Sequence, residues 1–260
     1  VAVVDIASFV IAAATVVALK LREERPTREE GEWRQEFMAG IRHIGSDLVL
    51  KHTLIAIAVA LLVVGFMESA VFAAVDGFGK PASFVGIVIS LQGVGAIAGG
   101  VSSTRVIRKV GEPKAIWISL LVFAAALAAA AASPWLAGFM AAIVLLGVAL
   151  PILIVALMTL LQVRTPGALM GRVSAAADVL LGTPQAGSIA LGALLVTLIS
   201  WRSIFWIAAA VIGFSACYLA NSLRGYRPPA EAVESVEPAE TADTVITVTP
   251  GEPVLPDLLG

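Results

Sequence analysis

The chain has 260 residues, of which 59% are hydrophobic and 14% are charged, whereas soluble domains contain about 45–50% apolar and about 25% charged residues. The mean hydropathy is +0.95 and the formal net charge is -2, so the composition indicates a membrane protein and offers no basic surplus for binding nucleic acid. The single cysteine, Cys217, excludes an intrachain disulfide, and the His and Cys residues lack the spacing of a zinc or iron–sulfur site. We expect no nucleic-acid partner, no metal and no cofactor.

Apolar runs long enough to cross a bilayer recur along the chain. A spanning helix needs about 20 largely apolar residues, because the hydrocarbon core is about 30 Å thick and a helix rises about 1.5 Å per residue. Membrane strands would instead alternate between polar and apolar residues over about 10 positions. The sequence therefore predicts an all-α membrane protein with seven transmembrane helices. They are expected at residues 1–19, 53–75, 83–104, 114–132, 135–161, 173–199 and 202–223.

Positive charge is distributed unevenly between the two sides of these spans. When the seven spans alternate in direction, all of the 17 Lys and Arg residues except Lys80 and Arg202 fall on one side. Cytoplasmic loops retain the excess of Lys and Arg. We therefore expect a multi-pass protein of the cell (inner) membrane whose linker 20–52, loops 105–113 and 162–172, and C-terminal tail are cytoplasmic.

The first expected span begins at the first residue of the chain, on the outer side. That residue is Val, and the segment has neither a positively charged n-region nor an A-x-A-like cleavage site, so it does not resemble a signal peptide. We therefore expect the chain to continue a longer polypeptide whose earlier spans precede Val1.

The expected linker, residues 20–52, is polar in its first half and amphipathic in its second. Apolar residues recur there at spacings of three and four, which places them on one helical face opposite charged residues. These residues are Trp33, Phe37, Ile41, Ile44 and Leu48. The pattern predicts a helix lying along the inner membrane surface, with packing on a cytoplasmic domain as the alternative.

The last part of the chain differs in composition from the spans. Residues 225–260 are rich in Pro, Glu, Ala, Thr and Val, which predicts a disordered cytoplasmic tail. The segment between linker and tail, residues 53–224, is expected to form a unit of six transmembrane helices.

Three local motifs carry a family resemblance. Residues 100–109 read GVSSTRVIRK, which is similar to the loop pattern G-x-x-x-D-R-x-G-R-K with Thr104 in place of the acid and Ile107 in place of the second glycine. Residues 162–173 read QVRTPGALMGRV and match the pattern Q-x-x-x-P-x-x-x-x-G-R-V. The third motif, DIASF at residues 5–9, is similar to the start of a sixth transmembrane helix.

These motifs, and a cytoplasmic linker followed by six spans, resemble the major facilitator superfamily. Within it they are similar to the bacterial branch of enterobactin exporters and macrolide-efflux-like proteins. The resemblance covers about residues 1–224 and implies that the seven spans correspond to helices 6 to 12 of a transporter built from two six-helix halves. It also implies a partner, the missing N-terminal half of the same polypeptide.

Few polar side chains lie within the expected spans. Because exposing such groups to lipid is costly, they are candidates for a substrate and proton pathway. Glu68 would suit alternating protonation, or it is an acid near the outer interface that only hydrates or pairs with Lys80. Asp178 is a second candidate, or an ordinary first-turn acid. Gln92 and Gln185 would bind substrate, or hydrogen-bond neighbouring helices.

A basic cluster after the third span allows two interpretations. Arg105, Arg108 and Lys109 form a cytoplasmic gate with the missing half, or they only determine topology.

Small residues and prolines bear on packing. A small-residue surface for close helix approach is expected on residues 83–104, formed by Gly86, Ser90, Gly95, Gly99 and Gly100. Pro151 and Pro184 are expected to kink their helices.

The function implied by the resemblance is secondary transport. We expect a multi-pass transporter that exports a small amphipathic compound, such as a drug or a siderophore, in exchange for protons across the lipid bilayer. A membrane-embedded enzyme would need clustered catalytic groups, whereas His43 and His52 are isolated in the sequence, so we do not expect an enzyme. A non-transporting structural or regulatory remnant of a transporter is the alternative.

Overall fold

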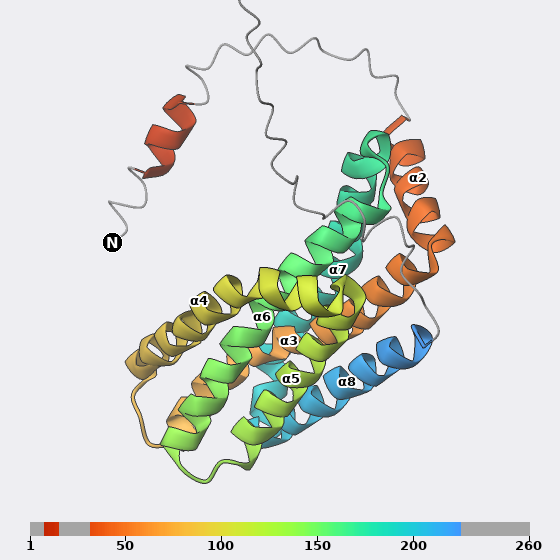
Figure 1. The fold of residues 1–260 in the computed structure, drawn as a ribbon. Coiled ribbons are helices and arrows are strands. Elements are labelled where there is room, and N and C mark those ends of the chain that lie inside the picture. The colour runs from red at the N-terminus through yellow and green to blue at the C-terminus, as the bar shows by residue number, and fades with distance from the viewer. Residues whose placement is uncertain (1–7, 16–31, 225–260) are drawn as a thin grey trace, which may run out of the picture. The chain divides into compact units, whose positions relative to one another are not determined.

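The computed structural model describes residues 8–15 and 32–224 (Figure 1). Residues 8–15 are helical and fall within the expected span 1–19, whose other residues lie outside the described ranges. The expected tail, 225–260, also lies outside them, as does the start of the linker. Six helices among the described residues are long and apolar enough to cross a membrane, compared with the seven expected.

The six long helices follow one another through short connections, so the predicted all-α class is confirmed. They are α3 (Leu48–Gly77), α4 (Val85–Val110), α5 (Glu112–Ala132), α6 (Leu136–Arg164), α7 (Met170–Leu198) and α8 (Trp201–Ser222). Short 3-10 turns, Ala82–Phe84 and Gly167–Leu169, precede α4 and α7. Gly111 alone separates α4 from α5, and its φ of 82° is a conformation that glycine adopts without steric cost.

The first of these helices begins five residues before its expected start at residue 53, because Asp47 caps it. The Asp47 carboxylate accepts hydrogen bonds from the backbone N–H groups of Val49 and Leu50, at 2.8 and 2.9 Å. Such a side chain satisfies N–H groups that have no partner inside a helix. Leu48 therefore belongs to α3 rather than to the amphipathic face expected for the linker, and its side chain is exposed.

The amphipathic helix of the linker, α2 (Glu32–Ser46), is shorter than expected and packs mainly against α7. Ile44 is buried, and Gly40 lies so close to α7 that a Cβ there would overlap the carbonyl oxygen of Arg172. The side chain of Trp33 lies outside those described. The structure thus brings α2 against the spanning helices themselves, while its position at a membrane surface stays a prediction.

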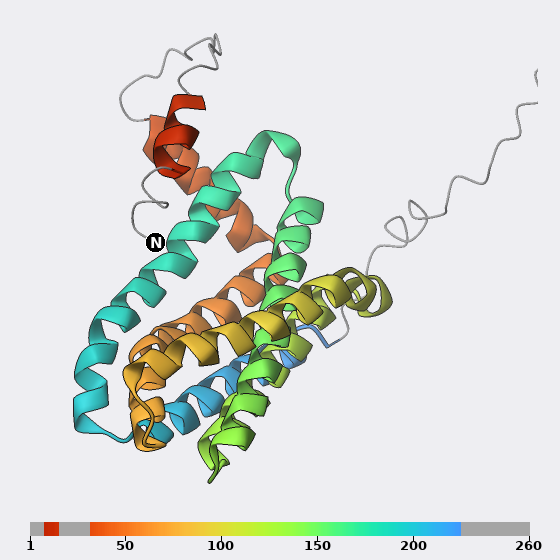
Figure 2. The same cartoon turned by 90° about the vertical axis from the view of Figure 1, so that its left-hand side faces the viewer.

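The spanning helices pack in the order α4, α6, α5, α8, α3, α7, each along the next. Figure 1 shows α5 beside α8, and Figure 2 shows α7 running beside α3. In this order α4 packs on α6 as α7 packs on α3, and α5 packs on α6 as α8 packs on α3. Helices α3 to α5 and helices α6 to α8 thus form two repeats with the same packing pattern. The repeats are inverted relative to each other because α3 and α6 cross the bundle in opposite directions.

Glycines allow the close contact between α4 and α6. A Cβ at Gly95 would overlap the carbonyl oxygen of Val144, and one at Gly147 would overlap the carbonyl oxygen of Gln92. Small residues at such points let two helix backbones approach each other. The backbone contact makes this helix pair a tightly packed unit.

One part of the small-residue expectation is not realised, and the prolines lie inside continuous helices. Gly86 and Gly100 face open space, so only part of the expected surface contacts another helix. Helices α6 and α7 continue unbroken through Pro151 and Pro184. Neither proline therefore ends its helix, and the kinks expected at these positions stay a prediction.

Arg202, at the start of α8, holds together the end of the bundle opposite to Asp47. Its guanidinium donates hydrogen bonds to the carbonyl oxygens of Ala131 and Ser133, at 2.6 and 2.9 Å, and lies 4.5 Å from the centre of the Trp201 ring. Trp201 in turn packs against Phe78. A cation is favourable there because the last carbonyl groups of α5 carry partial negative charge.

Candidate functional site

A cavity of about 480 Å³ lies among the spanning helices, lined mainly by α3, α4 and α6 with contributions from α7. Helices α4 and α7 are at the two ends of the packing order and do not pack along each other. They are also the least buried spans, with 22% and 12% of their most apolar windows buried, compared with 56% for α5. The cavity therefore lies on the side of the bundle where α4 and α7, the two ends of the packing order, do not close on each other.

The cavity lining is apolar except for three residues, namely Glu68 from α3, Gln92 from α4 and Gln185 from α7. At about 1.5 Å per residue, Glu68 lies about 14 Å from the end of α3 at Gly77, and Gln92 lies about 10 Å from the start of α4 at Val85. Both distances are measured from the same end of the bundle, so these two side chains lie at similar depth. Gln185 lies close to the middle of α7, about 20 Å from its end. The structure thus gathers three of the four polar candidates into one cavity.

Glu68 is the only ionisable side chain in the lining. No Lys, Arg, His or Asp lines the cavity, and within the described part of the chain no ion pair joins Glu68 to Lys80. The pairing with Lys80 is therefore not formed, and hydration at the outer interface stays as the alternative role. The side chain of Glu68 is open to the cavity rather than buried between helices.

Asp178 does not lie with the other three candidates. It is exposed and is absent from the cavity lining, although it belongs to α7 like Gln185. It is also more than two turns beyond the start of α7 at Met170, so the expectation of a first-turn acid was wrong. Arg172, in the first turn of α7, donates a hydrogen bond to Glu36 of α2, at 3.1 Å.

The proposed gate residues Arg105, Arg108 and Lys109 are all exposed near the end of α4. None of them forms an ion pair within residues 32–224. They lie at the opposite end of α4 from Gln92. Their side chains are therefore available to the aqueous phase or to a partner.

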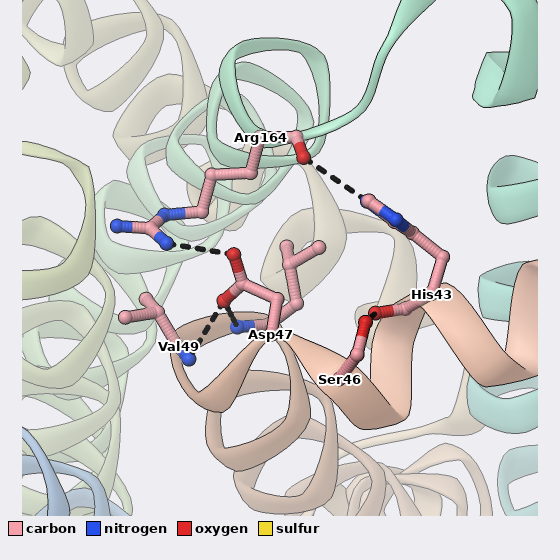
Figure 3. Close-up of polar contacts among 6 residues, drawn as sticks. His43, Ser46, Asp47, Val49 and Arg164 are labelled. Atoms are coloured by element: carbon pink, nitrogen blue, oxygen red, sulfur yellow. Dashed lines mark hydrogen bonds and ion pairs between the residues drawn. The ribbon is translucent and has the colours of Figure 1, made fainter.

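A polar cluster that sequence reasoning missed joins α2, α3 and α6 (Figure 3). The guanidinium of Arg164 donates to the Asp47 carboxylate at 2.8 Å, and the His43 ring is 3.1 Å from the backbone carbonyl oxygen of Arg164. Burial raises the pKa of Asp47, but the N–H of Leu50, the hydrogen bond and charge of Arg164 and the N–H of Val49 outweigh it, so the net pKa is below its ordinary value. Asp47 stands directly before an apolar run, which is the sequence signal of a helix N-cap.

The second histidine is also paired. The Nδ1 atom of His52 on α3 lies 2.6 Å from the hydroxyl oxygen of Tyr218 on α8, and the two rings meet edge to face. Neither residue lines the cavity. Each histidine thus has a hydrogen-bond partner on a distant helix, which its place in the sequence does not reveal. No group of three or more His, Cys, Asp or Glu residues that could hold a metal occurs in the described ranges.

Comparison with known proteins identifies the family. The model of the Major Facilitator Superfamily matches residues 2–186 and, in a second match, residues 78–255. Searches of curated proteins and of solved structures gave no match. Together the two family matches span most of the chain, and members of this family are transporters rather than enzymes. The chain, a multi-pass membrane protein, belongs to the Major Facilitator Superfamily.

Proposed function

We propose that this chain forms the second half of a proton-coupled exporter of small amphipathic compounds such as drugs, in the branch of enterobactin exporters and macrolide-efflux-like proteins. The observation that carries the proposal is the apolar cavity that contains a single carboxylate and two amides. A cavity of this size matches those that hold drug-sized ligands, which range over about 300–1,000 Å³.

Glu68 is the coupling group in this proposal. An ionised carboxylate within a spanning helix is costly unless water, a cation or a proton compensates its charge. When the cavity faces the more acidic side Glu68 takes up a proton, and when the cavity faces the other side it releases the proton. Substrate enters the cavity from the cytoplasmic side and leaves on the outer side, while the proton crosses the membrane in the opposite direction.

The opposing half is the partner that the mechanism requires. Helices α4 and α7 leave the cavity open between them, and their low burial supports a second unit packed along both. We assign that unit to the N-terminal half expected from the sequence. The loops after α4 and α6 would face the cytoplasm of an inner-membrane protein, and Arg105, Arg108 and Lys109 would close that side against the other half.

The experiment is uptake of a fluorescent amphipathic dye by inverted membrane vesicles from cells that express the complete reading frame encoding this chain. Energised vesicles should accumulate the dye, and nigericin, which collapses the pH gradient, should stop accumulation more strongly than valinomycin, which collapses the electrical potential. Dye accumulation that persists after nigericin would contradict proton coupling. No accumulation under any gradient would favour the alternative, a non-transporting remnant.

A further inference from the structure

One face of α2 is turned toward the connection between α6 and α7. Glu36, Gly40 and His43 recur at spacings of four and three, which places them on one side of the helix. All three are buried or partly buried, whereas Met38 and Arg42, on the opposite side, are exposed. The orientation of α2 about its axis is therefore determined by contacts with the spanning helices.

These contacts reach both ends of the connection. At the start of α7, Arg172 donates a hydrogen bond of 3.1 Å to Glu36, and a Cβ at Gly40 would overlap the carbonyl oxygen of Arg172. At the end of α6, the Nε2 atom of His43 lies 3.1 Å from the carbonyl oxygen of Arg164 (Figure 3). A carbonyl oxygen only accepts, so the ring nitrogen is the donor. Helix α2 thus bridges the connection from the end of α6 to the start of α7.

The other end of α2 is joined closely to α3. Asp47 alone separates the two helices, and its N–H group donates to the carbonyl oxygen of His43 at 3.2 Å. The N–H group of Lys51 donates to the carbonyl oxygen of Asp47 at 2.9 Å. Backbone hydrogen bonds therefore continue across the bend between α2 and α3. Ile44, in the last turn of α2, is buried beside this bend.

Helix α7 depends on this arrangement for support at its first residues. It makes little contact with α6 along its length and packs instead along α3 and α2. It is also the span with the smallest buried share, 12% of its most apolar window. An element fixed to α3, to the end of α6 and to the start of α7 therefore connects the three helices at one end of the bundle.

We infer that α2 is a brace of the six-helix half: it stays docked on α6 and α7 and moves with them as one body when the cavity opens to either side. This inference rests on the proposed function, since that function requires the cavity to open to each side in turn. The competing behaviour is a helix that leaves α7 whenever the cytoplasmic side opens.

The test measures the distance between α2 and α7 in proteoliposomes that contain the complete reading frame. The native cysteines, Cys217 among them, are replaced by serine, and spin labels are attached to Met38→Cys and Leu198→Cys, both at exposed positions. Leu198, the last residue of α7, lies about 39 Å from Arg172 at about 1.5 Å per residue. Double electron–electron resonance should give one peak for this pair, at the same distance with and without a pH gradient.

A second labelled pair reports whether the halves move. It joins Leu198→Cys to Val10→Cys, an exposed position in the expected span 1–19, which corresponds to the last helix of the other half. Its distance should change when the pH gradient is applied. A change in the Met38–Leu198 distance would overturn the inference and leave the proposed function intact. A constant Val10–Leu198 distance would instead contradict the movement that the proposed function requires.

Two glycines of α2 test the docking without any movement of the halves. Gly40→Leu should shift the Met38–Leu198 distribution to longer distances, because the new side chain would overlap the backbone of Arg172. Gly45→Leu is the matched control, since Gly45 faces open space, and should leave the distribution unchanged. Equal distributions for the two leucine variants would overturn the brace, whatever the halves do.

Discussion

Arg164, the last residue of α6, donates a hydrogen bond of 2.8 Å to Asp47, the residue that caps the start of α3. Helices α3 and α6 are the first helices of the two inverted repeats, and they make little contact along their lengths. The ion pair therefore ties the two repeats together at one end of the bundle. The attachment of His43 to the same Arg164 extends this connection to α2.

The first prediction concerns the two roles of Asp47. Asp47→Asn retains an N-cap but loses the charge, whereas Asp47→Ala loses both, so the alanine variant should be the less stable. Loss of the cap alone should cost about 1 kcal/mol of unfolding free energy. Thermal unfolding of the purified chain in detergent, followed by circular dichroism, measures the difference. Equal melting temperatures for the two variants would contradict the capping role.

The second prediction follows from the lowered pKa of Asp47. Since its folded-state pKa lies below the ordinary value of 3.8, its ionised form stabilises the fold fully above that value, and the contribution disappears as the pH falls through the folded-state pKa. The stability gap between wild type and Asp47→Asn should therefore be largest at neutral pH and shrink in strong acid. Unfolding measured over a pH series tests this prediction. A stability gap between the two proteins that widens toward acid would contradict it.

The third prediction tests the contact between α4 and α6 with two glycines of one helix. Gly95→Ala should destabilise the chain because its Cβ would overlap the carbonyl oxygen of Val144. Gly93 faces open space, so Gly93→Ala should be neutral or stabilising by up to about 1 kcal/mol through helix propensity. Melting temperatures measured side by side decide the point. Equal responses of the two variants would show that the close approach is not needed for stability.

The fourth prediction concerns Arg202 at the other end of the bundle. Arg202→Ala should cost about 1.5–3 kcal/mol, because two hydrogen bonds from a charged group are lost. Arg108→Ala, which removes an exposed cation without an ion pair in residues 32–224, serves as the control and should change little. Denaturant unfolding of both variants provides the measurement, and equal losses of stability would remove the capping role of Arg202.

The sequence alone predicts most of the helices because the length and hydrophobicity needed to cross a bilayer are local properties. Asp47 explains the shifted start of α3, and it too is a local signal. The contacts of the histidines are different, since Arg164 and Tyr218 lie 121 and 166 residues away from His43 and His52. No local periodicity reveals which distant helix end will lie beside a given ring.

The candidate site shows the same division between local and distant information. Depth along a span could be estimated for Glu68, Gln92 and Gln185 by counting residues. Their common cavity depends on how α3, α4 and α7 rotate about their axes, which tertiary packing determines. Asp178 shows the consequence, because it shares α7 with Gln185 yet is absent from the cavity lining. In a nearly uniformly apolar helix, the face that points into a cavity cannot be assigned without knowing the neighbouring helices.

The central claim is that Glu68 couples proton movement to export. Glu68→Gln preserves shape and hydrogen bonding but cannot ionise, and Asp178→Asn is the matched control because Asp178 lies outside the cavity lining. The most direct measurement is export of an amphipathic dye, as a function of pH, by energised inverted vesicles that contain each variant of the complete reading frame. We predict that export by the wild type and by Asp178→Asn changes with pH, whereas the pH dependence disappears in Glu68→Gln at equal protein level. An unchanged pH profile in Glu68→Gln would contradict the claim and remove Glu68 from the mechanism.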